Sequence, residues 1–258
     1  MRVRTVTALV LAMLAAGSVA TPTAAPAAGV PDPSPVTSPA SGDPRGTVLL
    51  IHGGAWAHHG PVYALREHRR HAARLNALGY RTVSITYRPG AHALPDVVAF
   101  YDRLRRRVGP RRPVCALGDS AGGHLSLMLA ARRPGLDCAI SRGAPTDLRF
   151  AHGEWLRAVE RRLAPHVPLA RISPVTHASS LAGRALASHG LQDPVVDHGQ
   201  LVRLRRAARG RIQTMSLPPG PADYAHAGVA APALHRLEHA EAQMLAAASR
   251  GYGAGSGR

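Results

Sequence analysis

The chain has 258 residues, of which 45% are hydrophobic and 4% aromatic, and its formal net charge is +17. This length predicts one domain with appendages, and the apolar content excludes a chain that is disordered throughout. All 32 basic residues are arginines, so the charge is explained by a compositional bias at least as well as by function. Because the arginines are dispersed over several expected helices, we expect weak association with anionic surfaces and no specific nucleic-acid partner.

The N-terminal residues 1–28 have the features of a signal peptide. Arg2 and Arg4 precede an apolar run over residues 6–16, and the small residues Ser18 and Ala20 fit a cleavage site. The run is too short to span a bilayer, and no other segment of the sequence has the apolar length of a membrane span. We therefore expect a secreted, extracellular protein without stable membrane insertion. A membrane anchor that is never cleaved is the alternative.

Two further segments are expected to lie outside the folded domain. Residues 29–44 are rich in Pro, Ala and Ser. Proline is unfavourable inside helices and strands, so this segment should be a flexible lead-in. Residues 251–258 form a Gly-rich tail that we expect to be disordered. The folded domain should therefore cover residues 45–250.

Within this domain, short apolar runs alternate with amphipathic stretches. The runs predict strands at residues 47–51, 82–87, 114–117, 138–141, 185–188 and 212–217. Helical spacing of apolar residues predicts helices at 65–78, at 97–108, after the third strand as far as 131, and at 234–248. Strands that alternate with helices indicate an α/β fold, with a parallel sheet covered on both faces.

A five-residue motif follows the third predicted strand and begins the next helix. Residues 118–122 read Gly-Asp-Ser-Ala-Gly, which is the pattern G-x-S-x-G. In this position the small residues allow a tight turn that exposes the hydroxyl of Ser120 above the edge of the sheet. The motif therefore predicts that Ser120 is a nucleophile.

A second motif follows the first predicted strand. Residues 52–56 read His-Gly-Gly-Ala-Trp. Glycines let the backbone approach a substrate closely, so that backbone amides can face a developing oxyanion. We expect His52 to have a structural role. A plain glycine turn is the alternative reading of this segment.

Together, the two motifs resemble the α/β-hydrolase superfamily, in its esterase and lipase branch that carries an HGG motif. The resemblance covers about residues 45–248 and includes the stretches 172–177 and 189–196. It implies an α/β-hydrolase fold, a Ser-His-Asp triad in the chain order Ser, Asp, His, and no cofactor. Because little chain precedes residue 47, we expect a reduced, mostly parallel sheet of about six strands with helices on both faces.

Carried over to this sequence, the resemblance implies Ser120 as nucleophile, Asp193 as acid and His226 as base. The oxyanion hole would be formed by the backbone amides of Gly53, Gly54 and Ala121. The sequence departs from the family at Ala55, where a third glycine is common. It departs again in the proline-rich stretch before His226.

Several other side chains compete for the same roles. Asp147 and Asp197 are rival acids, although Asp197 is also placed to cap a helix. His198 is expected at the surface. His235 and His239 are expected on the solvated face of the last helix.

The segment between Asp147 and Ile172 is an insertion with helical spacing at Trp155, Val159 and Leu163. It predicts either a short lid over the acyl pocket or an ordinary surface helix. Trp56 and Trp155 are the only two tryptophans, and either could line the substrate pocket. The low aromatic content favours small acyl groups.

Cys115 and Cys138, the only cysteines, fall on neighbouring predicted strands. An exported chain permits a disulfide between them, and two buried free thiols are the alternative. The sequence has no metal-ligand spacing. The sequence therefore predicts a secreted serine hydrolase that cleaves small-molecule or polymer esters through an acyl-enzyme. A peptidase or amidase on the same scaffold, or an inactive basic binding protein, is the alternative.

Overall fold

The computed structural model describes residues 36–37, 42–57, 59–150, 163 and 167–253. The predicted signal peptide at 1–28 lies outside the described residues, and so do most of residues 29–41. The predicted lid falls largely in the ranges 151–162 and 164–166, which are also outside, and Trp155 is among them. The same holds for the end of the tail at 254–258.

The described chain forms a seven-stranded sheet with the strand order β1-β3-β2-β4-β5-β6-β7. Six of these strands run parallel to one another, as the sequence predicts. They are β2 (Thr47–Ile51), β3 (Arg81–Ile85), β4 (Val114–Asp119), β5 (Cys138–Arg142), β6 (Ala185–Gly190) and β7 (Gln213–Leu217). The expected reduced, mostly parallel sheet of about six strands is confirmed.

The seventh strand, β1 (Val36–Thr37), pairs antiparallel with β3 and forms one edge of the sheet. It lies within the proline-rich segment 29–44, where the sequence predicts no strand. Its two residues fall between Pro35 and Pro39. A short pairing at the sheet edge is compatible with nearby prolines, because the prolines themselves need not donate to the ladder.

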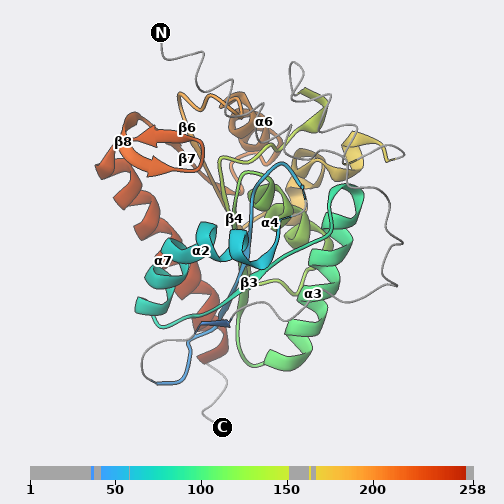
Figure 1. Ribbon diagram of the computed structural model, residues 1–258, viewed down its shortest axis with the longest axis vertical. Coiled ribbons are helices and arrows are strands. Elements are labelled where there is room, and N and C mark those ends of the chain that lie inside the picture. The colour runs from blue at the N-terminus through green and yellow to red at the C-terminus, as the bar shows by residue number, and fades with distance from the viewer. Residues whose placement is uncertain (1–35, 38–41, 58, 151–162, 164–166, 254–258) are drawn as a thin grey trace.

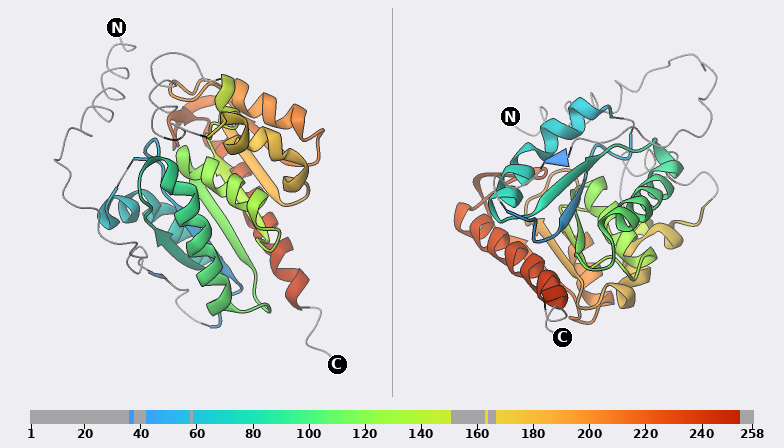
Figure 2. Two further views of the ribbon diagram at one scale, coloured as in Figure 1. Left: turned by 90° about the vertical axis from the view of Figure 1, so that its right-hand side faces the viewer. Right: turned by 90° about the horizontal axis from the view of Figure 1, so that it is seen from below.

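Helices cover both faces of the sheet (Figures 1 and 2). The described α-helices are α2 (Pro61–Ala77), α3 (Ala93–Val108), α4 (Ala121–Arg132), α6 (Gly199–Ala207) and α7 (Ala231–Gly253). Short 3-10 helices occur at Gly90–His92, Leu148–Phe150, Leu169–Ile172 and Pro174–Leu181. Helix α7 extends three residues beyond the predicted end of the domain at residue 250.

Alternate side chains of the central strands point to opposite faces, so the core has two layers. Leu49 and Ile51 of β2 pack in a cluster with residues of α3, α4 and α6. Val48 and Leu50 point the other way and pack with Leu75 of α2 and with the end of α7. None of these strand residues is exposed, which explains why the sequence shows a continuous apolar run.

The two cysteines lie directly opposite each other on β4 and β5 and form a disulfide. Their Cα atoms are 4.6 Å apart, and both side chains are buried in the cluster that also holds Leu75. Of the two alternatives that the sequence allows, the structure has the disulfide.

A two-stranded hairpin, β8 (Pro219–Tyr224) and β9 (Ala227–Val229), precedes α7 (Figure 1). The sequence predicts a proline-rich loop here. The hairpin is separate from the main sheet, so its prolines interrupt no central ladder. Its turn contains Ala225 and His226, and it therefore determines where this histidine lies.

Among the helices of the described ranges, none combines the length and the apolar content of a transmembrane span.

Candidate active site

Ser120 lies in the sharp turn between β4 and α4. Its φ of 55° is in the left-handed region, which is unfavourable for a side chain other than glycine. The turn is held by a hydrogen bond of 2.8 Å from the Ser120 amide to the Arg142 carbonyl. A Cβ at Gly122 would overlap the carbonyl oxygen of Ile51, so the close contact between this helix and β2 requires glycine. These features hold the Ser120 hydroxyl at the carboxyl end of the sheet.

His226 lies in the turn of the β8–β9 hairpin. Its Nδ1 is 3.0 Å from Oδ2 of Asp193, which follows β6. The neighbouring Tyr224 anchors the hairpin, because its hydroxyl donates to Ser188 Oγ at 2.9 Å and accepts from the Gly143 amide at 3.1 Å. The fold thus brings together two residues that are 33 positions apart in the chain.

Asp193 is held as a carboxylate. Its Oδ1 accepts hydrogen bonds from the amides of Val195 and Val196, each 2.9 Å long, and its side chain is fully buried. Burial would raise the pKa of Asp193, but hydrogen bonds from His189, His226 and the Val196 amide hold it well below its ordinary value. The ionised form can accept the Nδ1–H of His226 and fix the tautomer of that ring.

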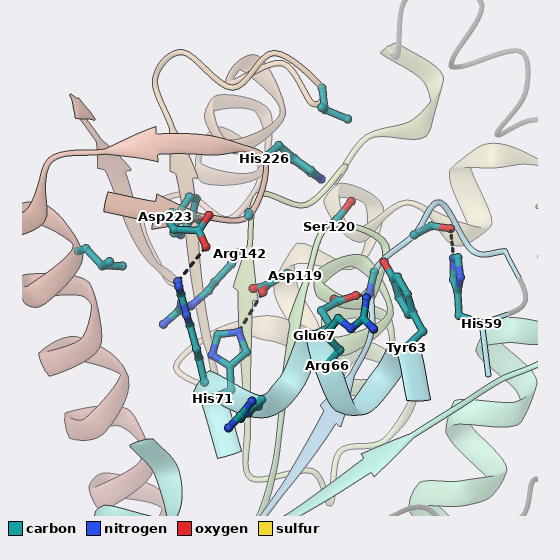
Figure 3. Close-up of a pocket in the computed structure, with 18 of the residues that line it drawn as sticks. His59, Tyr63, Arg66, Glu67, His71, Asp119, Ser120, Arg142, Asp223 and His226 are labelled. Carbon is teal, nitrogen blue, oxygen red and sulfur yellow. Dashed lines mark hydrogen bonds and ion pairs between the residues drawn. The ribbon is translucent and has the colours of Figure 1, made fainter. Parts of the chain in front are cut away.

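Ser120 and His226 line one pocket of about 770 Å³ (Figure 3). Within the described part of the chain, no hydrogen bond joins the Ser120 hydroxyl to the imidazole of His226. Such hydrogen bonds often tighten only when a substrate binds. The pocket therefore presents a serine hydroxyl and an Asp-oriented imidazole to the same space.

The three amides predicted for the oxyanion hole differ in their surroundings. Ala121 is the first residue of α4, so its N–H has no acceptor within the helix. Gly54 lines the pocket with a φ of 86°. The N–H of Gly53, in contrast, donates to Oε1 of Glu67 at 2.7 Å. In this structure Gly53 is therefore engaged with a side chain, unlike the free amide that the motif predicts.

Glu67 belongs to the candidate active site, although no motif in the sequence points to it. It lies on α2 and lines the pocket close to Ser120 (Figure 3). Burial raises the pKa of Glu67 to about 7, and the nearby Asp119 acts in the same direction, while the hydrogen bond from Gly53 opposes the rise. Tyr63, Glu67 and His71 recur every four residues, so the spacing shows that they share a helix face. It does not show that this face lines the site.

Next to the nucleophile in the chain, Asp119 forms a partly buried pair with His71. The Nε2 of His71 lies 2.9 Å from Oδ2 of Asp119. Burial would raise the pKa of Asp119, but His71 and the positive charge of Arg142 hold it well below its ordinary value. Arg142 in turn donates two hydrogen bonds of 2.7 Å to Glu241 of α7. This network ties α2, the nucleophile turn and α7 together along the pocket wall.

Trp56, one of the two tryptophans expected as candidates to line the substrate pocket, does not line the pocket that contains Ser120. Its side chain is fully buried in the core, and its indole N–H donates to Nδ1 of His124 at 3.1 Å. The backbone is left-handed at both Ala55 and Trp56, with φ values of 53° and 54°, where the chain turns the indole into the core. The other predicted tryptophan, Trp155, lies outside the described residues.

The rival residues have other contacts. Asp147 pairs with Arg149 at 2.8 Å, and Asp197 accepts a hydrogen bond of 2.8 Å from the Gly199 amide at the start of α6. The rival histidines lie on or beside helices: His198 bonds to Ser216 Oγ, and His239 bonds to Gln243. None of these rivals, nor His235, lines the pocket that contains Ser120.

Comparison with known proteins gives both a sequence family and a set of structural neighbours. A sequence model of the prolyl oligopeptidase family matches residues 82–218, slightly more than half of the chain. This range includes Ser120 and Asp193 and ends before His226. No curated protein matches the sequence.

Several solved structures have a similar fold at low sequence identity. A truncated carbohydrate esterase from gut microbiota has a TM-score of 0.65 at 17% identity, covering 83% of this chain and 90% of its own. Esterase 2 of Thermogutta terrifontis has a TM-score of 0.64 at 19% identity, covering 86% and 89%. A hormone-sensitive lipase from a metagenome library has a TM-score of 0.63 at 17% identity, covering 95% and 92%. At these identities the likeness establishes the α/β-hydrolase fold.

Proposed function

The chain belongs to the prolyl oligopeptidase family of α/β-hydrolases, and on this basis we propose that it is a serine hydrolase that cleaves carboxylic esters. The nucleophile would be Ser120, the base His226 and the acid Asp193. The observation that carries the proposal is the hydrogen bond of 3.0 Å between His226 and Asp193 beside the strained turn of Ser120, in one pocket. The esterase and lipase neighbours favour esters as substrates.

In the first half of the proposed reaction, Ser120 Oγ attacks the ester carbonyl, and Nε2 of His226 takes the hydroxyl proton. Asp193 stabilises the imidazolium that forms, because it is buried, ionised and bonded to Nδ1. The oxyanion would be stabilised by the amides of Ala121 and Gly54. The imidazolium then protonates the leaving alcohol, which departs and leaves an acyl-Ser120.

In the second half, water replaces the alcohol. His226 takes a proton from the water, the resulting hydroxide attacks the acyl carbonyl, and the carboxylic acid is released as Ser120 regains its proton. These steps need an acid-base pair and an oxyanion site and consume only the ester and water.

The test is covalent labelling with a fluorophosphonate, followed by hydrolysis of p-nitrophenyl esters of graded acyl length. We expect labelling at Ser120 and turnover of at least one ester, with both lost in Ser120→Ala. Ser180→Ala is the matched control, because Ser180 is exposed and does not line the pocket. An unlabelled wild-type protein without turnover would instead favour the inactive binding scaffold.

The family match favours peptide or amide hydrolysis as the second candidate function, since the family is named for an oligopeptidase. The two functions share the same nucleophile and differ in the leaving group. The comparison of p-nitrophenyl acetate with p-nitroacetanilide separates them, because the acyl group is the same in both. We expect the ester to be cleaved and the anilide to be cleaved far more slowly or not at all.

Export from the cell is part of the proposal. It is supported by the signal-peptide features of residues 1–28 and by the disulfide between Cys115 and Cys138, since disulfides persist in oxidising compartments.

A further inference from the structure

The wall of the pocket that is formed by α2 carries two arginines that have no acidic partner among the described residues. Arg66 and Arg69 are three residues apart, are exposed, and line the pocket that contains Ser120 and His226. No residue in the described ranges forms a hydrogen bond or an ion pair with either guanidinium. Figure 3 shows Arg66 beside Glu67 on the helix next to Ser120. Their positive charge is therefore available to the contents of the pocket.

The other arginines of the pocket are neutralised by carboxylates. Arg70 pairs with Asp223 of the β8–β9 hairpin at 2.8 Å, and Arg142 pairs with the buried Glu241 at 2.7 Å. Arg74 contacts the same Glu241. Arg66 and Arg69 therefore differ from the other arginines of the pocket, whose charges are balanced by carboxylates.

The carboxylates of the pocket are also engaged elsewhere. Asp119 pairs with His71, and Glu238 lies 3.7 Å from Arg74. Glu67 accepts the Gly53 amide, and burial raises its pKa to about 7, so it carries only part of a negative charge near neutral pH. Within the described residues, no pocket acid is left to neutralise Arg66 and Arg69.

A guanidinium presents several N–H donors in a planar fork that matches carboxylate, phosphate and sulfate groups. We propose that the ester substrate carries such an anionic group, which Arg66 and Arg69 bind while the ester carbonyl lies at Ser120. This inference rests on the proposed esterase function and adds the charge of the substrate to it. An acidic ester would gain affinity and orientation from the two arginines, and a neutral ester of the same shape would not.

The test compares pairs of esters that differ in charge. 4-Acetoxybenzoate carries a carboxylate on the leaving group, and methyl 4-acetoxybenzoate is its neutral counterpart, with acetate release as the readout. Monomethyl glutarate carries the carboxylate on the acyl side, and methyl pentanoate is its neutral counterpart, with methanol release as the readout. 4-Acetoxybenzenesulfonate then distinguishes a site for carboxylates from a site for anions in general.

For the wild-type protein, we expect a higher kcat/KM for the anionic ester in at least one pair. In Arg66→Gln/Arg69→Gln, the ratio of anionic to neutral ester should fall by about fivefold, and added salt should weaken the wild-type preference. The control is Arg205→Gln/Arg206→Gln, which removes two exposed charges from α6, away from the pocket. An unchanged ratio in the pocket variant, or an equal fall in the control, would overturn the inference.

The outcomes separate this inference from the proposed function. If the wild-type protein hydrolyses neutral esters but prefers neither anionic ester, the inference fails and the esterase function stands. If it hydrolyses none of the esters, the esterase function fails. In that case, calorimetry of 4-acetoxybenzoate binding to Ser120→Ala tests whether the anion site exists. Binding that is lost on substitution of Arg66 and Arg69 supports the site, and absent or unchanged binding overturns it.

Discussion

The carboxylate of Glu67 accepts a hydrogen bond of 2.7 Å from the amide of Gly53, a residue of the motif that predicts the oxyanion hole. A Cβ added to Gly53 would lie 3.3 Å from Ser120 Cβ, so this amide is held very close to the nucleophile. Glu67 thus links α2 to the loop that follows β2. We interpret it as a positioning residue that fixes this loop while Gly54 and Ala121 face the substrate.

This interpretation predicts different effects for two substitutions of Glu67. Glu67→Ala removes the acceptor of the Gly53 amide, and kcat for p-nitrophenyl acetate should fall by about tenfold, the scale of one hydrogen bond to a charged group. Glu67→Gln retains an acceptor oxygen and should keep most of the activity. Steady-state kinetics on both variants checks this. A higher kcat in Glu67→Ala would mean that Glu67 competes with the oxyanion for Gly53.

The catalytic assignment predicts a graded series of losses. Ser120→Ala and His226→Ala should each lower kcat by about a thousandfold or more, because nucleophile and base act as one unit. Asp193→Asn should cost less than either, since an amide at this position favours the wrong histidine tautomer but leaves the nucleophile in place. Activity assays with a fluorophosphonate label check the series. Retained activity in His226→Ala together with its loss in His198→Ala or His235→Ala would contradict the assignment of the base.

The stability of the fold should fall on acidification because of a buried histidine. Burial lowers the pKa of His124 to about 4, from an ordinary value of 6.5, so the folded protein keeps this ring neutral where the unfolded chain protonates it. The resulting stability is present above pH 6.5 and is lost as the pH falls toward 4. The contribution of His124 to this loss is at most about 3 kcal/mol, from the size of its pKa change.

Thermal unfolding as a function of pH checks this prediction. His124→Gln should flatten the decline between pH 6.5 and 4, although it should also lower the overall stability because the Trp56 indole loses its acceptor. His235→Gln is the matched control, because His235 is exposed on α7. The same flattening in both variants would rule out His124 as the cause.

Export predicts a shortened N-terminus. The mature protein should begin between residues 21 and 30, where small residues provide cleavage sites. N-terminal sequencing of protein from the culture medium checks this. Cell-bound protein that still begins with Met1 would favour the uncleaved anchor.

Much of the fold follows from local patterns in the sequence. The six parallel strands occur where apolar runs lie between amphipathic stretches, because both faces of such a sheet are buried. The turn at Ser120 is also local, since the small residues at 118 and 122 are required by the close packing of β4, α4 and β2. The β8–β9 hairpin is not predicted, because prolines normally indicate a loop and the pairing depends on where the hairpin packs.

The order of the elements and the nucleophile turn can be predicted from the amino-acid sequence, because both depend on residues that are neighbours in the chain. The contacts across the site follow from the three-dimensional packing. These include the Glu67–Gly53 hydrogen bond, the burial of Trp56 in the core, the pairing of Cys115 with Cys138, and the position of Arg66 and Arg69 in the pocket without an acidic partner in the described part of the chain. Each of them depends on the register of strands and the packing of helices from distant parts of the chain, and periodicity within one segment carries no information about its neighbours in space.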